Sequence, residues 1–307
     1  MTERKRGVRP RKNHDRELAV TAEAGLLEFL LGALSGRSRN HVKSLLTHRE
    51  VSVDGMVVTQ YDHLLRPGQI VRISRAVRRE ESPADALEIL YEDDELIVIN
   101  KPAGLLSIAT DKERVMTAYF LLTDYVRRDG PENRIYAVHR LDRDTSGVLM
   151  AAKNPEIQKA LQDGWAELVT ERSYAAVIEG KLDAKSGRVH SWLRETKTQL
   201  VYSSHTPGDG LEAITDYRVV REGNGYSLLA IRLLTGRKNQ IRVHMKDLGH
   251  PVAGDKKYGA ATNPAARLCL HADALELVHP FTHEVMRFEA RIPRRLLSLL
   301  KEPSGRG

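Results

Sequence analysis

The spacing of hydrophobic residues divides the chain into a first quarter with two helices and a remainder rich in strands. Apolar side chains recur at intervals of three and four over residues 26–34 and again over 38–46, which predicts two short helices. Residues 51–58 alternate between polar and apolar side chains around Asp54-Gly55, a pair typical of a hairpin turn. A closing strand is predicted over residues 70–73. Together these elements predict a small domain, an α/β-hairpin unit, over residues 17–76.

Beyond residue 87 the pattern changes to short apolar runs typical of strands. Such runs cover residues 96–99, 148–152, 174–178, 217–220 and 228–233, whereas helical spacing occurs over 117–128, 155–167 and 293–301. Few strand–helix–strand intervals occur, which favours antiparallel pairing. The prediction for residues 88–307 is therefore an α+β domain with a mixed, mainly antiparallel sheet and flanking helices. Residues 77–87, with an Arg-Arg-Glu-Glu run and a Ser-Pro pair, are predicted to be the linker.

Positive charge is concentrated at the start of the chain. The 307 residues carry 48 Lys and Arg against 41 Asp and Glu, a net charge of +7. Residues 1–16 hold seven basic and two acidic side chains (+5), residues 17–79 nine and six (+3), and residues 80–307 thirty-two and thirty-three (−1). The first segment has almost nothing to bury and is predicted to be a disordered tail. Non-specific affinity for a polyanion such as RNA is therefore expected in residues 1–79.

Cysteine content and hydropathy exclude several protein classes. The single cysteine, Cys269, cannot form an internal disulfide or complete a zinc or iron–sulfur site, which favours a reducing compartment. The longest apolar run, residues 26–34, is far shorter than the roughly 20 residues of a membrane span. Residues 1–16 lack the apolar core of a secretory signal. A cytoplasmic protein that does not cross a membrane is predicted.

Basic side chains gather on the second predicted helix and its flanks. Arg37, Arg39, Lys43 and Arg49 would present a positive face to a phosphate backbone. The order of two short helices and a hairpin resembles the small RNA-binding module shared by a small-subunit ribosomal protein and tyrosyl-tRNA synthetases. The resemblance implies that residues 17–76 bind RNA. The alternative is a helical cap with a solvated charged face.

The densest polar cluster of the chain is His139-Arg140-Leu141-Asp142-Arg143-Asp144-Thr145-Ser146-Gly147, which leads into the apolar residues 148–152. A charged loop that enters a buried strand is a common way to hold a reactive group rigidly. The segment does not fit a calcium-binding loop, because Lys153 stands where the final glutamate is needed and the flanking residues look like strands instead of helices. As a kinase catalytic loop it is interrupted by Leu141, and the chain has no phosphate-binding loop or dinucleotide fingerprint. With these alternatives excluded, Asp142 remains as the candidate reactive group, a carboxylate surrounded by arginines.

A second basic cluster would add to the positive charge around Asp142. Residues 232–246 hold five basic side chains and no acidic one, and they begin at the end of a predicted strand. Arg242 within this cluster is predicted to form an ion pair with Asp142. Positive neighbours keep a carboxylate ionised, which suits a nucleophile or a general base.

Three motifs carry a resemblance to a known family. The run 139–147 looks like the signature of the RluA family of RNA pseudouridine synthases. Asn100-Lys101-Pro102-Ala103-Gly104-Leu105 is similar to the first motif of that family, and Thr235-Gly236-Arg237 with Gln240-Ile241-Arg242-Val243-His244 resembles its last. Leu106-Ser107-Ile108 and Lys238-Asn239 depart from the family pattern. These departures bear on the substrate site rather than on the reaction.

The resemblance implies isomerisation of uridine within RNA, in which the base is detached from the ribose and rejoined through carbon. Asp142 would act either as a nucleophile on the sugar or as the base that removes a sugar proton, and Arg242 would orient it. Tyr174 would stack on the flipped base and Arg140 would fill the space that the base leaves. Further substrate-binding positions are implied for His139, Lys101, Arg237, Gln240 and Leu270. The structural alternatives are a core residue of a strand for Tyr174 and a surface residue for Lys101.

Such a reaction is redox-neutral, so neither a cofactor nor a metal is expected. The expected partner is RNA, with large-subunit ribosomal RNA first and transfer RNA second, and a monomer is the default. Two other classes of function stay open. A non-catalytic RNA-binding or ribosome-assembly factor with the same fold would not depend on Asp142, and a metal-dependent hydrolase would lose its activity to a chelator.

Overall fold

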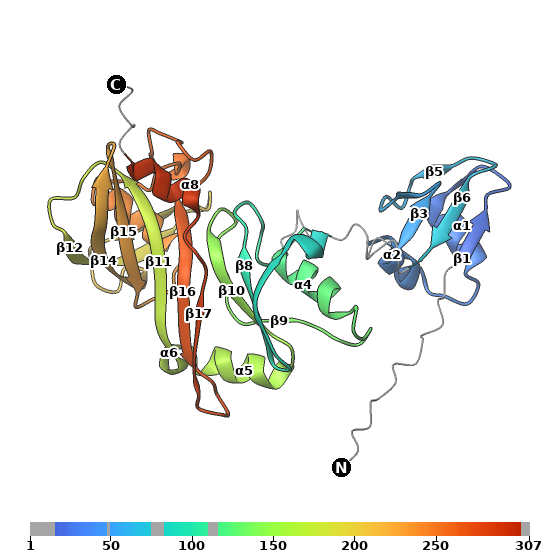
Figure 1. Ribbon diagram of the computed structural model, residues 1–307, viewed down its shortest axis with the longest axis horizontal. Coiled ribbons are helices and arrows are strands. Elements are labelled where there is room, and N and C mark those ends of the chain that lie inside the picture. The colour runs from blue at the N-terminus through green and yellow to red at the C-terminus, as the bar shows by residue number, and fades with distance from the viewer. Residues whose placement is uncertain (1–15, 48–49, 75–82, 110–115, 302–307) are drawn as a thin grey trace, which may run out of the picture. The chain divides into compact units, whose positions relative to one another are not determined.

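The computed structural model describes residues 16–47, 50–74, 83–109 and 116–301 (Figure 1). The chain divides into two compact units, Met1–Ala86 and Leu87–Gly307. The predicted tail lies outside the described residues except for Arg16, which begins strand β1 (Arg16–Ala19). In the predicted linker, residues 77–82 lie outside the described part, and Pro83–Ala86 form the short 3-10 turn η1.

The first unit contains the two helices and the hairpin that the sequence predicts. The helices are α1 (Leu26–Ala33) and α2 (Arg39–Thr47). One antiparallel sheet has the order β1, β6 (Ile70–Ile73), β3 (Val51–Val53), β4 (Met56–Val57), and β2 (Ala24–Gly25) pairs separately with β5 (Leu64–Leu65). The leucine and valine side chains that set the helical spacing are buried against these strands, and they form the core of this unit.

The hairpin turn of the first unit depends on its Asp-Gly pair. Asp54 and Gly55 both adopt positive φ angles, 50° and 84°, which a two-residue hairpin turn requires and which aspartate and glycine tolerate. The Asp54 carboxylate accepts hydrogen bonds from the backbone N–H of Ile70 at 2.9 Å and from the side-chain amide of Gln69 at 2.8 Å. The turn therefore fastens the hairpin to the neighbouring strand β6.

An eleven-stranded sheet forms the second unit and confirms the predicted α+β class. Its main path runs β13 (Val201–Ser204), β12 (Ser186–Glu195), β14 (Leu211–Gly223), β15 (Tyr226–Leu233), β11 (Val169–Glu179), β16 (Leu270–Val278), β10 (Ser146–Ala152), β8 (Leu96–Lys101), β7 (Glu88–Glu92). Strand β17 (Val285–Glu289) pairs with β16, and β9 (Tyr136–Ala137) pairs with β10. Among these strands β10 and β16 pair in parallel, whereas the other pairs are antiparallel.

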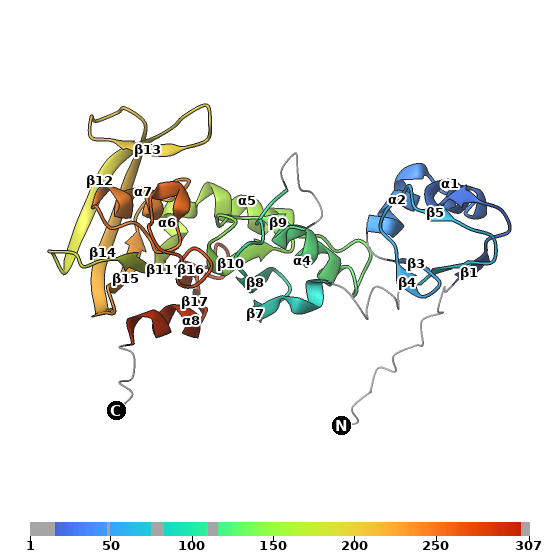
Figure 2. The same cartoon turned by 90° about the horizontal axis from the view of Figure 1, so that it is seen from above.

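Helices cover both faces of this sheet, with α5 and α7 on one side and α8 on the other (Figure 2). The helices are α4 (Ala118–Val126), α5 (Pro155–Asp163), α6 (Trp165–Leu168), α7 (Gln240–Asp247) and α8 (Arg294–Leu297), which is followed by the 3-10 turn η3 (Ser298–Leu300). Thr117 and Asn154 cap α4 and α5, because their side-chain oxygens accept the backbone N–H three residues on. The prediction of one helix over 155–167 is wrong, since the chain bends at Gly164 between α5 and α6.

Strands β10 and β16 meet closely at Gly147. This glycine has a φ of 114°, and a Cβ atom there would collide with the carbonyl oxygen of Ala272 on β16. Next to it, the Ser146 hydroxyl lies 2.8 Å from Nδ1 of His271 and accepts a 2.8 Å hydrogen bond from Arg267. The end of the Asp142 loop is therefore fixed to β16 by both backbone and side chains.

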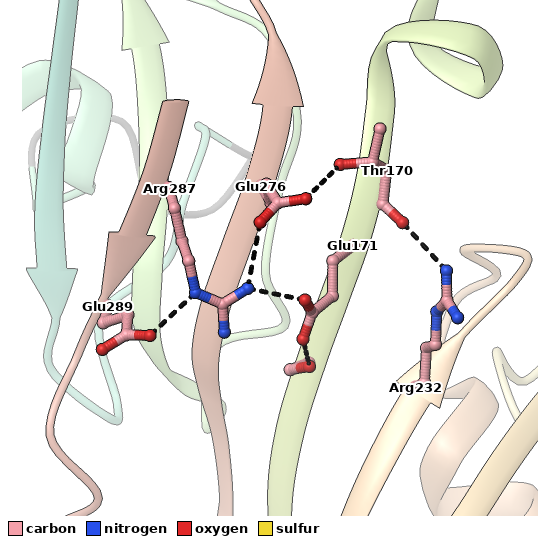
Figure 3. Close-up of polar contacts among 7 residues, drawn as sticks. Thr170, Glu171, Arg232, Glu276, Arg287 and Glu289 are labelled. Carbon is pink, nitrogen blue, oxygen red and sulfur yellow. Dashed lines mark hydrogen bonds and ion pairs between the residues drawn. The ribbon is translucent and has the colours of Figure 1, made fainter. Parts of the chain in front are cut away.

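Strands β11, β16 and β17 are also tied together by a group of charged side chains (Figure 3). Arg287 on β17 donates to Glu171 on β11 at 2.6 Å, to Glu276 on β16 at 3.3 Å and to Glu289 on its own strand at 2.8 Å. Thr170 on β11 donates to Glu276 at 2.8 Å. These contacts hold the first residues of β11, a few positions before Tyr174, against β16 and β17.

Candidate active site

A cavity of about 410 Å³ opens beside the loop that joins β9 to β10. The predicted catalytic and substrate-binding residues line it with one exception: His139, Arg140, Asp142, Tyr174, Arg237, Gln240, Arg242 and Leu270 are in its wall, and Lys101 is not. They come from the loop 138–145, from β11, from the start of β16, and from α7 with the segment before it. The fold thus brings together two of the three motifs, together with Tyr174 and Leu270, from distant parts of the sequence.

Buried hydroxyl groups clamp the backbone of the Asp142 loop. The hydroxyl of Ser107 donates to the carbonyl oxygen of Leu141 at 2.8 Å and accepts from the N–H of the same residue at 3.0 Å. The hydroxyl of Tyr119 donates to the carbonyl oxygens of His139 at 2.6 Å and Met150 at 3.0 Å. Ser107 belongs to the segment that departs from the family pattern. Here it has a structural role, because it holds the residue next to Asp142.

Lys101 lies beneath the loop rather than in the cavity, so its prediction as a substrate-binding residue is wrong. The side chain is fully buried, which also excludes the surface alternative. Its Nζ donates to the carbonyl oxygens of Pro102 at 3.0 Å, Leu105 at 2.7 Å and Arg143 at 3.0 Å. Burial lowers the pKa of the Lys101 ammonium group to about 7. The lysine joins the first motif to the loop of the second.

Burial dominates the electrostatics of Asp142. It raises the pKa of the carboxyl group above its usual value, whereas the charges of Arg242 and Arg140, a hydrogen bond from the backbone N–H of Asn239, and the charge of Lys238 lower it. The positive neighbours favour the ionised carboxylate, as the sequence predicts, but removal from water outweighs them in the free protein. A carboxylate with a raised pKa is a stronger base, which suits both proposed roles.

Arg242 does not form the predicted ion pair with Asp142. Its Nε and Nη2 atoms donate to the two carboxylate oxygens of Asp255 at 2.6 and 2.7 Å, and Asp255 is almost fully buried. The guanidinium group also lies over the ring of Tyr258, 4.9 Å from its centroid. Arg242 therefore acts on Asp142 through its charge, while Asp255 and Tyr258 keep it in place.

Tyr174 is on strand β11, as expected if it were simply a core residue of a strand, but it also lines the cavity. Burial raises the pKa of its hydroxyl to about 12, so the ring is neutral.

Arg172 lines the cavity as well, and sequence analysis missed it. The signal was available, because residues two apart on a strand share a face. The Arg172 guanidinium donates to the carbonyl oxygen of Leu234 at 2.8 Å, which fixes it beside the segment 235–239.

Two of the predicted substrate-binding side chains use their hydrogen-bonding groups within the protein. The Nε2 atom of His139 accepts from the N–H of Met150 at 3.0 Å, and burial lowers the pKa of the imidazole to about 4. The amide of Gln240 donates to Ile214 and Thr215 and accepts from Thr235 and Arg237. Both residues shape the wall of the cavity. Arg237 and Arg140 are exposed at the cavity.

Within the described residues, no three His, Cys, Asp or Glu side chains are grouped as a metal site. The helices of that part of the chain are all too short or too polar to span a membrane.

The arrangement is that of a family of RNA-modifying enzymes. A sequence profile described as RNA pseudouridylate synthase matches residues 95–247, which include the Asp142 loop and Arg242. An uncharacterized RNA pseudouridine synthase of Bacillus subtilis is 32% identical over 82% of this chain and 90% of its own length. Ribosomal large subunit pseudouridine synthase D of Yersinia pestis is 30% identical over 92% of this chain and 93% of its own. The chain belongs to the RNA pseudouridine synthase family, whose members are isomerases that act on RNA.

Solved structures agree with this assignment at the level of the fold. Human RNA pseudouridylate synthase domain containing 1 is 25% identical and superposes with a TM-score of 0.55 over 69% of this chain and 85% of its own. Human RNA pseudouridylate synthase domain containing 4 superposes with a TM-score of 0.59 at 23% identity, over 72% of this chain and 97% of its own.

Proposed function

We propose that this chain converts specific uridines to pseudouridine in structured RNA with Asp142 as the reacting carboxylate. The observation that carries the proposal is the position of Asp142 in a cavity of about 410 Å³ whose walls contain Tyr174 and Arg242. The ionised carboxylate would either attack the sugar or remove a sugar proton. In both routes the bond between ribose and N1 of the base breaks, the base turns, and a bond forms between ribose and C5. C5 then loses its proton to water, N1 takes up a proton from water, and any proton that Asp142 took from the sugar returns to it. No electrons are exchanged, so the chemistry requires no cofactor.

The target base must leave its stack before it reaches Asp142, at a free-energy cost of roughly a few kcal/mol. Two side chains beside Asp142 would offset this cost. The ring of Tyr174 faces the cavity and offers a stacking surface, which contributes roughly 1–3 kcal/mol per base. Arg140, which is exposed next to Asp142 on the same loop, would occupy the space that the base vacates. The exposed Arg237 would bind the backbone of the target strand.

We propose large-subunit ribosomal RNA as the substrate, with transfer RNA as the second candidate. The relatives from Yersinia pestis and Xanthomonas campestris bear the name ribosomal large subunit pseudouridine synthase D, and both align over most of this chain. We propose further that the protein acts as a monomer in the cytoplasm. The buried, unpaired Cys269 is suited to a reducing compartment.

The first unit is the proposed anchor for RNA. Arg37, Arg39 and Lys43 are exposed at the start of α2, whereas Arg49 lies outside the described residues. Arg39 and Lys43 are four positions apart and share one face of the helix. Tyr61, which sequence analysis missed, is 59% exposed, and the Lys43 ammonium lies 5.6 Å from the centroid of its ring. An exposed ring beside two cations is suited to stack an unpaired base while the cations contact phosphate.

The decisive experiment compares Asp142→Ala with Asp144→Ala, which changes an exposed carboxylate two residues further along the same loop. Cellular RNA from cells that lack the gene is treated with each protein and mapped for pseudouridine. We expect sites in large-subunit ribosomal RNA to be filled by the parent protein and by Asp144→Ala, and left unfilled by Asp142→Ala. Equal modification by Asp142→Ala and the parent would contradict the proposal. A phenotype that survives Asp142→Ala but not the loss of Arg37, Arg39 and Lys43 would favour a non-catalytic RNA-binding factor.

A further inference from the structure

Asn239 lies at the point where the Asp142 loop meets helix α7. It is the residue before Gln240, the first residue of that helix, and only 7% of its surface is exposed. Its backbone is left-handed, with φ 56° and ψ 18°. For most residues other than glycine, adopting this conformation costs roughly 1–2 kcal/mol, whereas asparagine tolerates it. Asn239 is part of Lys238-Asn239, the pair that departs from the family pattern in the sequence.

The left-handed turn aims a backbone donor at the reacting group. The N–H of Asn239 donates a hydrogen bond to the carboxylate of Asp142 and lowers the pKa of that carboxyl group. The N–H groups at the start of a helix have no partners within the helix, and they carry a partial positive charge.

The side-chain amide of Asn239 makes two further contacts that fix Arg242. Its Oδ1 atom accepts a 3.0 Å hydrogen bond from Nη1 of Arg242, and its Nδ2 atom donates a 3.0 Å hydrogen bond to the hydroxyl of Tyr258. Since Asp255 binds the other edge of the guanidinium and Tyr258 covers its face, the cation is held on three sides. It cannot follow Asp142 as the carboxylate moves or loses its charge.

We propose that Asn239 is a positioning residue for isomerisation: its backbone orients the Asp142 carboxylate, and its amide holds the Arg242 guanidinium beside that carboxylate. This inference rests on the proposed function of Asp142. Because the two contacts use different parts of Asn239, substitutions separate them. Asn239→Gly keeps the left-handed backbone and its N–H but removes the amide. Asn239→Ala removes the amide and also destabilises the left-handed backbone.

A positioning role predicts a change in pH dependence that a structural role does not. Asp142 must be ionised to react, and burial already raises its pKa. The other charged or titratable groups around it are Arg140 on its own loop, Lys238 and Arg242 from the segment that leads into α7, Tyr174 on β11 and Lys101 on β8. All of them remain in the Asn239 variants. Loss of the N–H and of the fixed cation would raise the pKa of Asp142 further, so the acid limb of kcat/KM would move to higher pH.

The experiment measures kcat/KM from about pH 5 to about pH 9 by tritium release from large-subunit ribosomal RNA labelled at carbon 5 of uridine. Asn239→Ala is expected to move the acid limb upward by about one pH unit, a loss of about tenfold at acid pH relative to alkaline pH. Asn239→Gly is expected to move it less. Asn239→Asp, which keeps an acceptor for Arg242 but adds a negative charge beside Asp142, is expected to move it at least as far as Asn239→Ala.

The matched control is Asn224→Ala. Asn224 has nearly the same backbone, with φ 52°, but is exposed in the turn between β14 and β15. This variant has the same backbone strain and is expected to keep the parent pH profile. Acid limbs that do not move in any Asn239 variant would overturn the positioning role, as would a loss of activity that is equal at every pH. Equal tritium release by the parent and by Asp142→Ala would instead overturn the proposed function, and the positioning role with it.

Discussion

The buried ammonium group of Lys101 donates a 3.0 Å hydrogen bond to the carbonyl oxygen of Arg143, the residue that follows Asp142. The same group binds two carbonyl oxygens in the loop after β8. One side chain therefore holds two motifs in register, and its contribution is to the geometry of the site rather than to contact with RNA.

The first prediction concerns this lysine. Lys101→Met fills a similar volume but leaves three carbonyl oxygens without a donor, so we expect the free energy of unfolding to fall by about 3 kcal/mol or more. Urea unfolding measures the loss. Lys159→Met is the control, because that lysine is highly exposed on α5 and solvent screens its ion pair with Asp163. Losses of similar size in the two variants would contradict the structural role of Lys101.

The second prediction concerns the close approach of β10 and β16 at Gly147. Gly147→Ala would introduce a methyl group into the carbonyl of Ala272, and we expect either an insoluble protein or one destabilised by about 3 kcal/mol or more. Gly225→Ala is a matched control, since Gly225 also has a positive φ, 77°, but has open space around it. It should lose only about 1 kcal/mol in thermal unfolding. If Gly147→Ala unfolded at the same temperature as Gly225→Ala, strands β10 and β16 would be able to move apart at Gly147 without loss of stability.

The third prediction concerns acid stability. Burial lowers the pKa of His139 to about 4 from 6.5, so the folded chain binds fewer protons than the unfolded chain between these values. Stability due to this group is present above pH 6.5 and is lost as the pH falls toward 4, by about 3 kcal/mol. His139→Gln keeps an acceptor for the N–H of Met150 but does not titrate. Unfolding measured at several pH values should give a weaker dependence in the variant.

Other histidines do not disturb that comparison. Burial also lowers the pKa of His244 to about 4, but His244 titrates alike in the parent and in His139→Gln. The difference between the two curves therefore reports His139. Parallel curves would mean that His139 is not buried in its neutral form.

The fourth prediction separates charge from stacking in the first unit. Arg39→Gln and Lys43→Gln should each reduce the slope of log affinity against log salt concentration by about 0.7, the value for one phosphate contact on single-stranded RNA. Tyr61→Ala should weaken binding by roughly 1–3 kcal/mol without a change in slope, and Tyr61→Phe should restore it. Filter binding of the full-length protein to an unpaired oligonucleotide measures both quantities. Tyr202→Ala, a change of an exposed tyrosine in the second unit, is the control. Equal losses from Tyr61→Ala and Tyr61→Phe would exclude stacking.

Periodicity was sufficient to predict the elements that have one buried face. Helices α1 and α2 bury the leucines and valines that gave the spacing, and the Asp54-Gly55 turn is set by two residues that tolerate positive φ. Helix α7 was not predicted, because the six consecutive residues from Gln240 to Met245 are all buried, polar and apolar alike, and no exposed position separates them. A segment surrounded by protein on all sides has no amphipathic pattern.

Motif resemblance brought Asp142, Tyr174 and Arg242 to one cavity but did not give the partner of each side chain. Arg242 was paired with the wrong carboxylate because Asp255 lies thirteen residues further on, in a segment without periodic structure. Lys101 beside Pro102 looks like a surface turn in the sequence, and its burial depends on the loop that folds over it. Such contacts are set by tertiary packing, which spacing along the chain does not record.

The parallel pairing of β10 with β16 has a consequence for how this enzyme matures. The Ser146–His271 contact joins residues 125 positions apart, and it closes the sheet next to the Asp142 loop. Contacts between such distant segments form late in folding, because the entropy of closing a long loop must be overcome first. A chain still emerging from the ribosome has the aspartate but not its cavity. Catalytic competence should therefore arise only after the residues of β16, Leu270–Val278, have left the ribosome.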